Sequence, residues 1–147
     1  MSFGYRLTLA GDIPLHQVAE LVGSHAVETT SPAGTRLLTV DRYDEDGYLI
    51  SITSGRHGYY DAEDDDTHWE WEPEQYVDIS FDMHTDDLVD KGIPNMVATV
   101  TRILTGRHED AALVQNGSHL LLTRTAGVVR RHRPSWWDHY HLNHPIT

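Results

Sequence analysis

Cysteine is absent from this chain, phenylalanine is rare, and basic residues are far outnumbered by acidic ones. The 147 residues include no cysteine, two phenylalanines, and 11 lysines and arginines against 23 aspartates and glutamates. Without cysteine the fold depends on no disulfide, which fits a reducing compartment. No apolar run approaches the ~20 residues that cross a bilayer, and the N-terminus lacks the basic and apolar segments of a secretory signal. We therefore expect a soluble, cytoplasmic protein that does not enter a membrane.

The length of the chain predicts one domain. A chain of this size removes about two-thirds of its unfolded surface from water, so it needs neither a disulfide nor a metal to fold. No internal repeat and no linker-like stretch interrupts the sequence. We therefore expect residues 1–147 to form a single domain.

The negative charge is concentrated in one part of the chain. Residues 41–90 hold 17 acidic and two basic residues, which gives −15, and the rest holds six acidic and nine basic residues, which gives +3. The two parts sum to the net charge of −12. An uneven distribution of this kind creates a negative face that steers a cationic partner. It disfavours nucleic acid and anionic membrane as partners, because binding to phosphates requires cations.

Apolar residues recur at intervals typical of a mixed fold. Alternating apolar and polar residues predict strands at residues 5–9, 36–42, 48–53, 76–84, 111–115 and 119–125. Helical spacing predicts two helices, one starting near Pro14 and one running from Pro94 to Gly106. Residues 28–34 and 43–47 have the composition of loops. Because the connections between strands are short, we expect an α+β domain with a mostly antiparallel sheet and two helices packed on one face.

The C-terminal tail, residues 130–147, is rich in tryptophan, histidine and arginine. Its basic run at residues 130–133 precedes Trp136, Trp137 and Tyr140. In so acidic a protein, a basic run is expected to lie against the protein's own negative face rather than on nucleic acid. The aromatic residues would then attach the tail to the domain.

The densest chemical signal is the acidic aromatic segment, residues 59–74. Eight of the 14 residues from Asp61 to Glu74 are acidic, and four aromatic residues are interleaved with them or precede them. Carboxylates at this density repel one another and attract a cation, and aromatic side chains often anchor protein contacts. We predict a binding site for a positively charged protein, formed by Tyr59, Tyr60, Asp61, Glu63, Asp64, Asp65, Asp66, Trp69, Glu70, Trp71, Glu72 and Glu74.

Two other interpretations of this segment stay open. It can be a solvated loop whose charges only keep the protein soluble. The alternation from Trp69 to Glu72 places both tryptophans on one side of a strand and both glutamates on the other, so the tryptophans can also belong to the core. In that case the aromatic contribution to binding falls to Tyr59 and Tyr60.

Carboxylate-rich stretches raise the question of a calcium site. Residues 44–47 and 64–66 supply oxygen ligands. An EF-hand loop requires acidic residues at alternate positions and a central glycine. When the loop is counted from Asp61, Asp66 stands at the glycine position. We therefore predict no calcium site.

The 11 histidines of the chain raise the question of a zinc site. His139 and His141 have strand-like spacing, with His132, His144 and Asp138 nearby in the sequence. No pattern of zinc-ligand spacing supports them. We predict no metal and no cofactor.

The alternative of an enzyme rests on Asp82, His84, His68 and Glu70. A carboxylate beside a histidine can orient a general base, so a small hydrolase, metal-dependent or using acid and base groups, is one alternative. The sequence contains no nucleophile elbow, no phosphate-binding loop and no dinucleotide-binding motif. We therefore predict no catalytic residue. A regulatory module for an unknown partner would use the same binding surface.

Short motifs along nearly the whole chain carry a family resemblance. They are YRLTLAG at 5–11, GYY at 58–60, WEWEP at 69–73, GIPNM at 92–96, DAALV at 110–114, LLTR at 121–124, HRP at 132–134 and WWDHY at 136–140. In their order they resemble the SitI-type immunity proteins of bacterial swarming-inhibition and other polymorphic toxin systems. The resemblance implies a non-enzymatic cytoplasmic protein that protects its producer or a sibling cell by binding a cognate toxin. Many toxin domains are basic nucleases, which an acidic inhibitor complements.

Overall fold

The computed structural model describes residues 2–22, 26–64, 67–84, 86 and 88–142. The strands are β1 (Ser2–Ala10), β2 (Val27–Thr30), β3 (Arg36–Arg42), β4 (Tyr48–Arg56), β5 (Tyr60–Asp64), β6 (Thr67–Trp71), β7 (Gln75–His84), β8 (Ala111–Gln115), β9 (His119–Thr125) and β10 (Val128–Arg131). The helices are α1 (Leu15–Val22), α2 (Tyr43–Asp46), α3 (Ile93–Gly106) and α4 (Pro134–His139), with one π-helical turn, η2 (Leu88–Gly92). The predicted α+β fold, dominated by its sheet, is confirmed.

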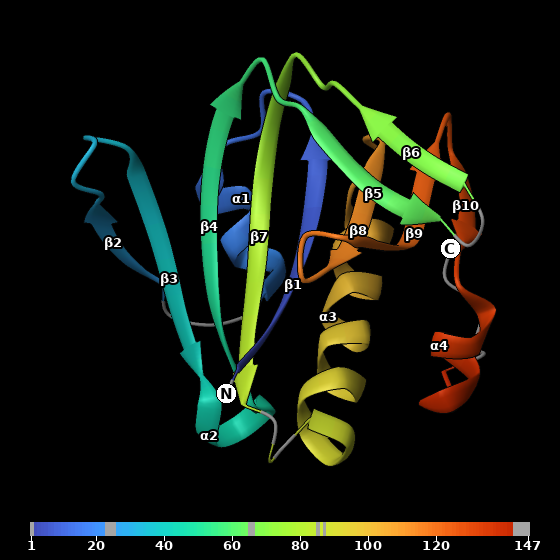
Figure 1. Ribbon diagram of the computed structural model, residues 1–147. Coiled ribbons are helices and arrows are strands. Elements are labelled where there is room, and N and C mark those ends of the chain that lie inside the picture. The colour runs from blue at the N-terminus through green and yellow to red at the C-terminus, as the bar shows by residue number, and fades with distance from the viewer. Residues whose placement is uncertain (1, 23–25, 65–66, 85, 87, 143–147) are drawn as a thin grey trace.

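The strands of the described residues form one sheet in the order β2-β3-β4-β7-β1-β8-β9-β5-β6, with β10 also paired to β9. All pairings are antiparallel except a single parallel bridge between Glu63 and His119. Strands β4 and β7 pair directly although β5 and β6 lie between them in the sequence. Figure 1 shows β5 and β6 crossing in front of β8 and β9, with α1 behind β4 and β7.

The two faces of the sheet follow from the alternation of its central strands. In β7 the buried Val77, Ile79, Phe81 and Met83 belong to the main hydrophobic core, as the sequence predicted. The intervening residues, among them Asp78, point to the opposite face because successive side chains alternate along a strand. In β8, Ala111 and Leu113 belong to the main core. Ala112 and Val114 belong to a second, smaller cluster on the opposite face.

Helices α1 and α3 cover the core face. The buried residues of α1 are Leu15, Val18, Ala19 and Val22, the stripe that the helical spacing predicted. Helix α3 starts with proline in its first turn and buries the predicted stripe of Met96, Val97, Val100, Ile103 and Leu104. A β-carbon added at Gly106 would lie 2.8 Å from the Leu21 side chain, so glycine permits the close approach of the two helices.

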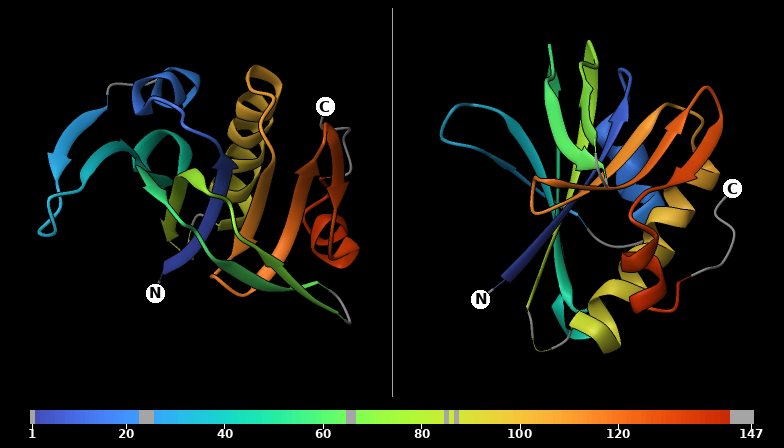
Figure 2. Two further views of the ribbon diagram at one scale, coloured as in Figure 1. Left: turned by 90° about the horizontal axis from the view of Figure 1, so that it is seen from above. Right: turned by 45° about the vertical axis from the view of Figure 1, so that its right-hand side comes forward.

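The short helix α4 extends the core at the C-terminal end. Trp136 and Trp137 are 9% and 1% exposed and join the main core cluster. The Trp137 indole donates hydrogen bonds of 3.0 Å to the carbonyls of Leu121 and His132. A buried indole N–H needs such acceptors, so the bonds fix α4 against β9 (Figure 2).

Two segments expected as loops contain regular structure. Within residues 28–34, the N-terminal half belongs to β2, whose four residues are all exposed at the edge of the sheet. An edge strand with no buried face leaves no alternation to detect. The connection at residues 43–47 contains helix α2, which ends at Gly47 with φ 90°, a left-handed conformation that glycine adopts readily.

Candidate functional site

The acidic aromatic segment folds into a β-hairpin whose two ends meet. The amide of His57 donates to the carbonyl of Glu74 at 2.7 Å, and that of Gly58 to the carbonyl of Pro73 at 2.9 Å. Between these ends β5 and β6 pair in antiparallel register, with Tyr60 opposite Trp71. We call residues 57–74 the acidic hairpin.

The aromatic residues of the acidic hairpin mostly face the sheet. Trp69 and Trp71 are half-buried against a cluster formed by Ala62, Ala112, Val114 and Leu120. Tyr60 is 8% exposed, and its ring lies 6.0 Å from that of Trp71 and 5.5 Å from that of Tyr76. These side chains therefore attach the hairpin to the sheet, and Tyr59, at 56% exposed, is the aromatic residue of the site that faces solvent.

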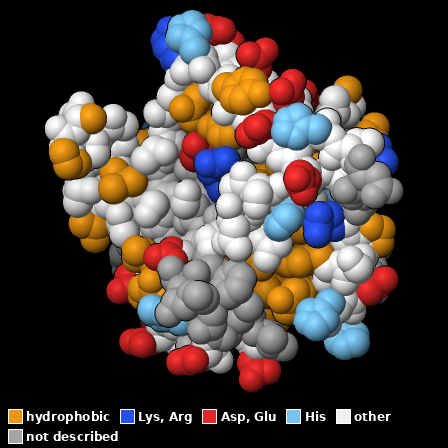
Figure 3. Space-filling model, in the orientation of Figure 1, with side chains coloured by type: hydrophobic (Ala, Val, Ile, Leu, Met, Phe, Trp, Pro, Cys, Tyr) orange, Lys and Arg blue, Asp and Glu red, His pale blue; other side chains and the backbone are white. Residues whose placement is uncertain are grey.

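The outer face of the acidic hairpin carries the charges. Its exposed acidic side chains are Asp61, Glu63, Glu70, Glu72 and Glu74, and His68 is exposed among them. His68 Nε2 lies 3.6 Å from a carboxylate oxygen of Asp61 and 3.7 Å from one of Glu70. Figure 3 shows acidic, histidine and hydrophobic side chains intermixed at the top of this view, where Figure 1 places the hairpin. Asp65 and Asp66 lie outside the described residues.

The carboxylates of the outer face change the pKa of Tyr59. Its hydroxyl donates to Glu70 Oε1 at 2.7 Å. That bond, with the nearby charges of Glu70, Asp61 and Glu72, raises the pKa of Tyr59 to about 12. Since a hydrogen bond to a carboxylate and neighbouring negative charge both disfavour the phenolate, Tyr59 stays protonated as a donor to Glu70.

A polar contact beneath the acidic hairpin fixes its first strand. The Asp78 carboxylate accepts hydrogen bonds from the Tyr60 hydroxyl at 2.9 and 3.0 Å and from the Thr8 hydroxyl at 2.5 Å. Burial, followed by the charge of Asp78, raises the pKa of Tyr60. The Arg6 guanidinium lies over the Tyr60 ring, with Cζ 4.8 Å from the ring centroid. Tyr60 thus stays protonated and bridges the hairpin to β1 and β7.

A second polar contact joins the hairpin to His132, which follows strand β10. Asp64 Oδ1 lies 2.8 Å from His132 Nδ1, and the other ring nitrogen of His132 lies 3.0 Å from the Thr123 hydroxyl. The side chains of His132 and Asp64 are only 6% and 18% exposed. The expected contact between the basic run and the acidic face is therefore made by His132. None of the arginines 130, 131 and 133 forms an ion pair with a carboxylate of the described residues, and Arg131 stacks on Trp137 instead.

The residues of the enzyme alternative are divided between two places. His84 stacks on Tyr43 with ring centroids 4.8 Å apart, whereas His68 lies between two carboxylates of the acidic hairpin. Asp82 lies on β7 with His84, and Glu70 lies on β6 with His68. Within the described ranges, no group of three or more histidine, aspartate and glutamate side chains is arranged to hold a metal ion.

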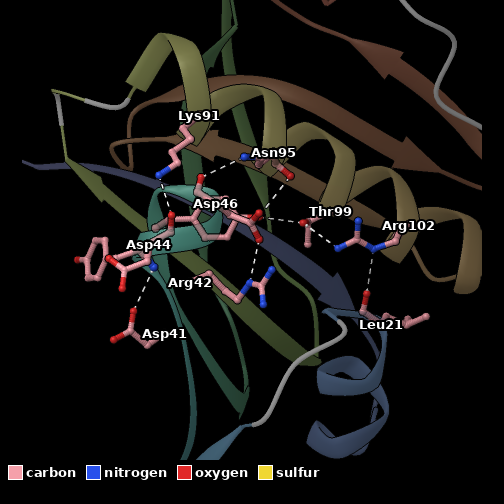
Figure 4. A network of polar contacts seen from close by, with 11 residues as sticks. Leu21, Asp41, Arg42, Asp44, Asp46, Lys91, Asn95, Thr99 and Arg102 are labelled. Carbon is pink, nitrogen blue, oxygen red and sulfur yellow. Dashed lines mark hydrogen bonds and ion pairs between the residues drawn. The ribbon is translucent and has the colours of Figure 1, made fainter.

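The other carboxylate-rich stretch, residues 44–47, has a structural role. Asp46 forms an ion pair of 2.9 Å with Arg42, and the carbonyl of Asp44 accepts a bond of 2.7 Å from Lys91 (Figure 4). The amide of Asn95 donates to the carbonyl of Asp46 at 3.4 Å. The two backbone contacts tie α2 to the start of α3, and the ion pair with Arg42 gives the Asp46 carboxylate a structural role.

Three residues of this site are not among those that sequence reasoning selected. Asp78 has a detectable signal, since it lies on the polar face of a strongly alternating strand. Arg6 has no such signal, because it is a polar residue in an ordinary amphipathic strand. His132 has none either, because it belongs to a basic run. Both gain their roles from contacts with the acidic hairpin.

The SitI3-like family model matches residues 3–141. This chain belongs to the SitI3-like family. The match confirms the predicted resemblance to SitI-type immunity proteins, and membership of the family supports an immunity role and argues for a protein that acts by binding. No curated protein and no solved structure matches the chain. Among the described residues, no helix is long and apolar enough to cross a membrane.

Proposed function

We propose that this protein is a non-enzymatic immunity protein that acts in the cytoplasm by binding a cognate, positively charged toxin through its acidic hairpin. The observation that carries the proposal is the outer face of that hairpin, where Tyr59 and Glu70 are hydrogen-bonded among further exposed carboxylates. The family membership supplies the biological role, and the charge supplies the chemistry of the partner.

The predicted site residues contribute in three ways under this proposal. The exposed carboxylates accelerate the encounter with a basic surface, because charges at the rim of an interface act mainly on the association rate. Tyr59 supplies an exposed aromatic anchor, and Trp69 and Trp71 are partly exposed beside it in the hairpin. Tyr60 and Asp64 hold the hairpin in place from below.

The test begins with affinity capture from the lysate of the native cell at low salt. A hairpin variant carrying Asp61→Asn, Glu63→Gln and Glu70→Gln is compared with the wild type. The matched control carries Asp12→Asn, Glu20→Gln and Asp90→Asn. It also removes three negative charges, but from exposed positions outside the hairpin. We expect one basic protein to be captured by the wild type and the control, and lost by the hairpin variant.

The captured protein is then used for kinetics and for a toxicity assay. We expect the association rate to fall about tenfold or more in the hairpin variant at low salt and the difference to shrink as salt rises. Co-expression of the wild type should relieve the toxicity of the partner, and the hairpin variant should relieve it less. Equal association rates for the hairpin variant and the control would refute binding through the acidic hairpin.

A further inference from the structure

Arg6 occupies an unusual place beneath the acidic hairpin. It lies on β1, on the face of the sheet away from the main core, between Ser80 of β7 and Val114 of β8. Its guanidinium stacks on the Tyr60 ring, and its side chain is half-buried. A cation therefore stands on the open face of a strongly acidic molecule, next to the surface proposed to bind the toxin.

The charge of Arg6 is not matched by a carboxylate. Arg36, Arg42 and Arg107 each form an ion pair with an acidic residue two to eight positions away. Arg6 forms none with the described residues, and its buried Nε has no acceptor among them. The nearby Asp78 carboxylate is engaged by Thr8 and Tyr60. The guanidinium of Arg6 therefore has no carboxylate partner among the described residues, and the Tyr60 ring is the group that it stacks on.

A surface hollow gives access to Arg6. Its volume is about 250 Å³, and Gly4, Arg6, Ser80, Asp82, Asn116 and Gly117 contribute to its lining. Asn116 is held in place because its Oδ1 accepts a bond of 3.0 Å from the amide of Gly4. The lining residues thus include an arginine, a serine and an asparagine, whose side chains donate hydrogen bonds to an anion, together with one carboxylate, that of Asp82. We call these residues the Arg6 hollow.

We propose that the Arg6 hollow receives the carboxylate of an aspartate or glutamate side chain presented by the protein partner. The identity of that partner rests on the proposed function, whereas the chemistry of the hollow does not. The planar fork of a guanidinium matches a carboxylate with two parallel hydrogen bonds. Asp82 lines the same hollow, and a phosphate with two charges would be repelled more strongly by it than a carboxylate with one.

The consequence for recognition is a partner surface of mixed charge. A partner that covers the acidic hairpin with basic side chains must also place one acidic side chain over Arg6. A basic protein without it would bury the guanidinium unpaired, which is strongly unfavourable. The hollow thus selects the cognate toxin from other basic proteins of the cell.

The chemistry is tested on the isolated protein by nuclear magnetic resonance. The Nε–H signal of Arg6 and the backbone amide signals of Gly4, Ser80 and Gly117 are followed while a blocked Gly-Glu-Gly peptide is added. We expect saturable shifts with a dissociation constant on the order of millimolar, since a single anchor gives weak affinity. Arg6→Gln should weaken binding at least about tenfold, and Arg56→Gln, at an exposed arginine outside the hollow, should leave it unchanged.

The outcomes separate the possible ligands. Tighter binding of inorganic phosphate than of the peptide would overturn the assignment to a protein carboxylate. Shifts that do not saturate in the wild type would also overturn it, and this result needs no substitution at Arg6. The hairpin variant described above should still bind the peptide. If it also captures the toxin as well as the wild type does, the proposed function is refuted and the carboxylate chemistry of the hollow still stands.

Discussion

Replacing His132 by alanine should detach the acidic hairpin from the C-terminal strand and destabilise the whole domain. The substitution leaves the largely buried Asp64 carboxylate without its partner at 2.8 Å and the Thr123 hydroxyl without its partner at 3.0 Å. A lost bond to a charged group costs about 1.5–3 kcal/mol and a neutral one about 1 kcal/mol, so the free energy of unfolding should fall by about 2.5–4 kcal/mol. In a domain of this length that corresponds to a melting temperature lower by about 5–15 °C.

The pairwise part of this effect is measured by a double-mutant cycle. Asp64→Asn, His132→Ala and the double variant are unfolded in urea and followed by tryptophan fluorescence. We expect a coupling free energy of about 1–2 kcal/mol, because residues in direct contact in one network are not additive. The matched control is His57 and Glu74, which pair at 3.1 Å with side chains 78% and 76% exposed.

The control pair should show no measurable coupling, because solvent screens an exposed ion pair and its ordering costs side-chain entropy. A coupling at residues 64 and 132 no larger than that at residues 57 and 74 would refute the reasoning. It would mean that burial does not strengthen the contact and that hydrophobic packing alone holds the hairpin.

Two further predictions concern the stability of the sheet. Burial raises the pKa of Tyr5 to about 12 and also raises the pKa of Tyr48, so the folded state favours the protonated phenols. The contribution of these tyrosines to the free energy of unfolding should therefore be constant below about pH 10 and be lost between pH 10 and 12. It is measured by urea unfolding at each pH, with tyrosinate absorbance as a second signal, and a flat profile between pH 10 and 12 would contradict it. Separately, a β-carbon at Gly55 would lie 2.4 Å from the Tyr76 hydroxyl, so Gly55→Ala should cost about 1–3 kcal/mol in urea unfolding. Gly4→Ala, whose β-carbon would meet its nearest atom at 4.0 Å, is the control, and equal stability of the two variants would refute the clash.

The sequence was sufficient to predict elements whose residues face two different environments. The alternation of residues 76–84 and the helical stripes of α1 and α3 arise because one side of each element is buried in the main core. Strand β2 escaped prediction since all its residues are exposed. A pattern of hydrophobicity records burial, and an element without a buried side leaves no such record.

The candidate site was only partly predictable for a related reason. The alternation of Trp69 and Glu70 predicts two faces for β6, but it does not specify what the tryptophan face contacts. The contact with Ala112 and Leu120 depends on strands about 40 to 60 residues away along the chain, and such long-range pairing is decided by the tertiary fold. The partners of Arg6 and His132 depend on the same placement of the hairpin.

The two ends of the acidic hairpin, residues 57–74, meet at its base. This geometry affects how the sequence of such a protein can change to bind a different partner. The hydrogen bonds of His57 and Gly58 to Glu74 and Pro73 close the segment at its base, so the hairpin leaves and rejoins the sheet beside the paired ends of β4 and β7. Substitutions on the exposed outer face of the hairpin can change the partner, whereas Tyr60, Trp69 and Trp71 must keep their contacts with the sheet. The contacts of Tyr60 with Asp78 and of Asp64 with His132 hold the inner side of the hairpin, so changes of partner specificity are confined to its outer side.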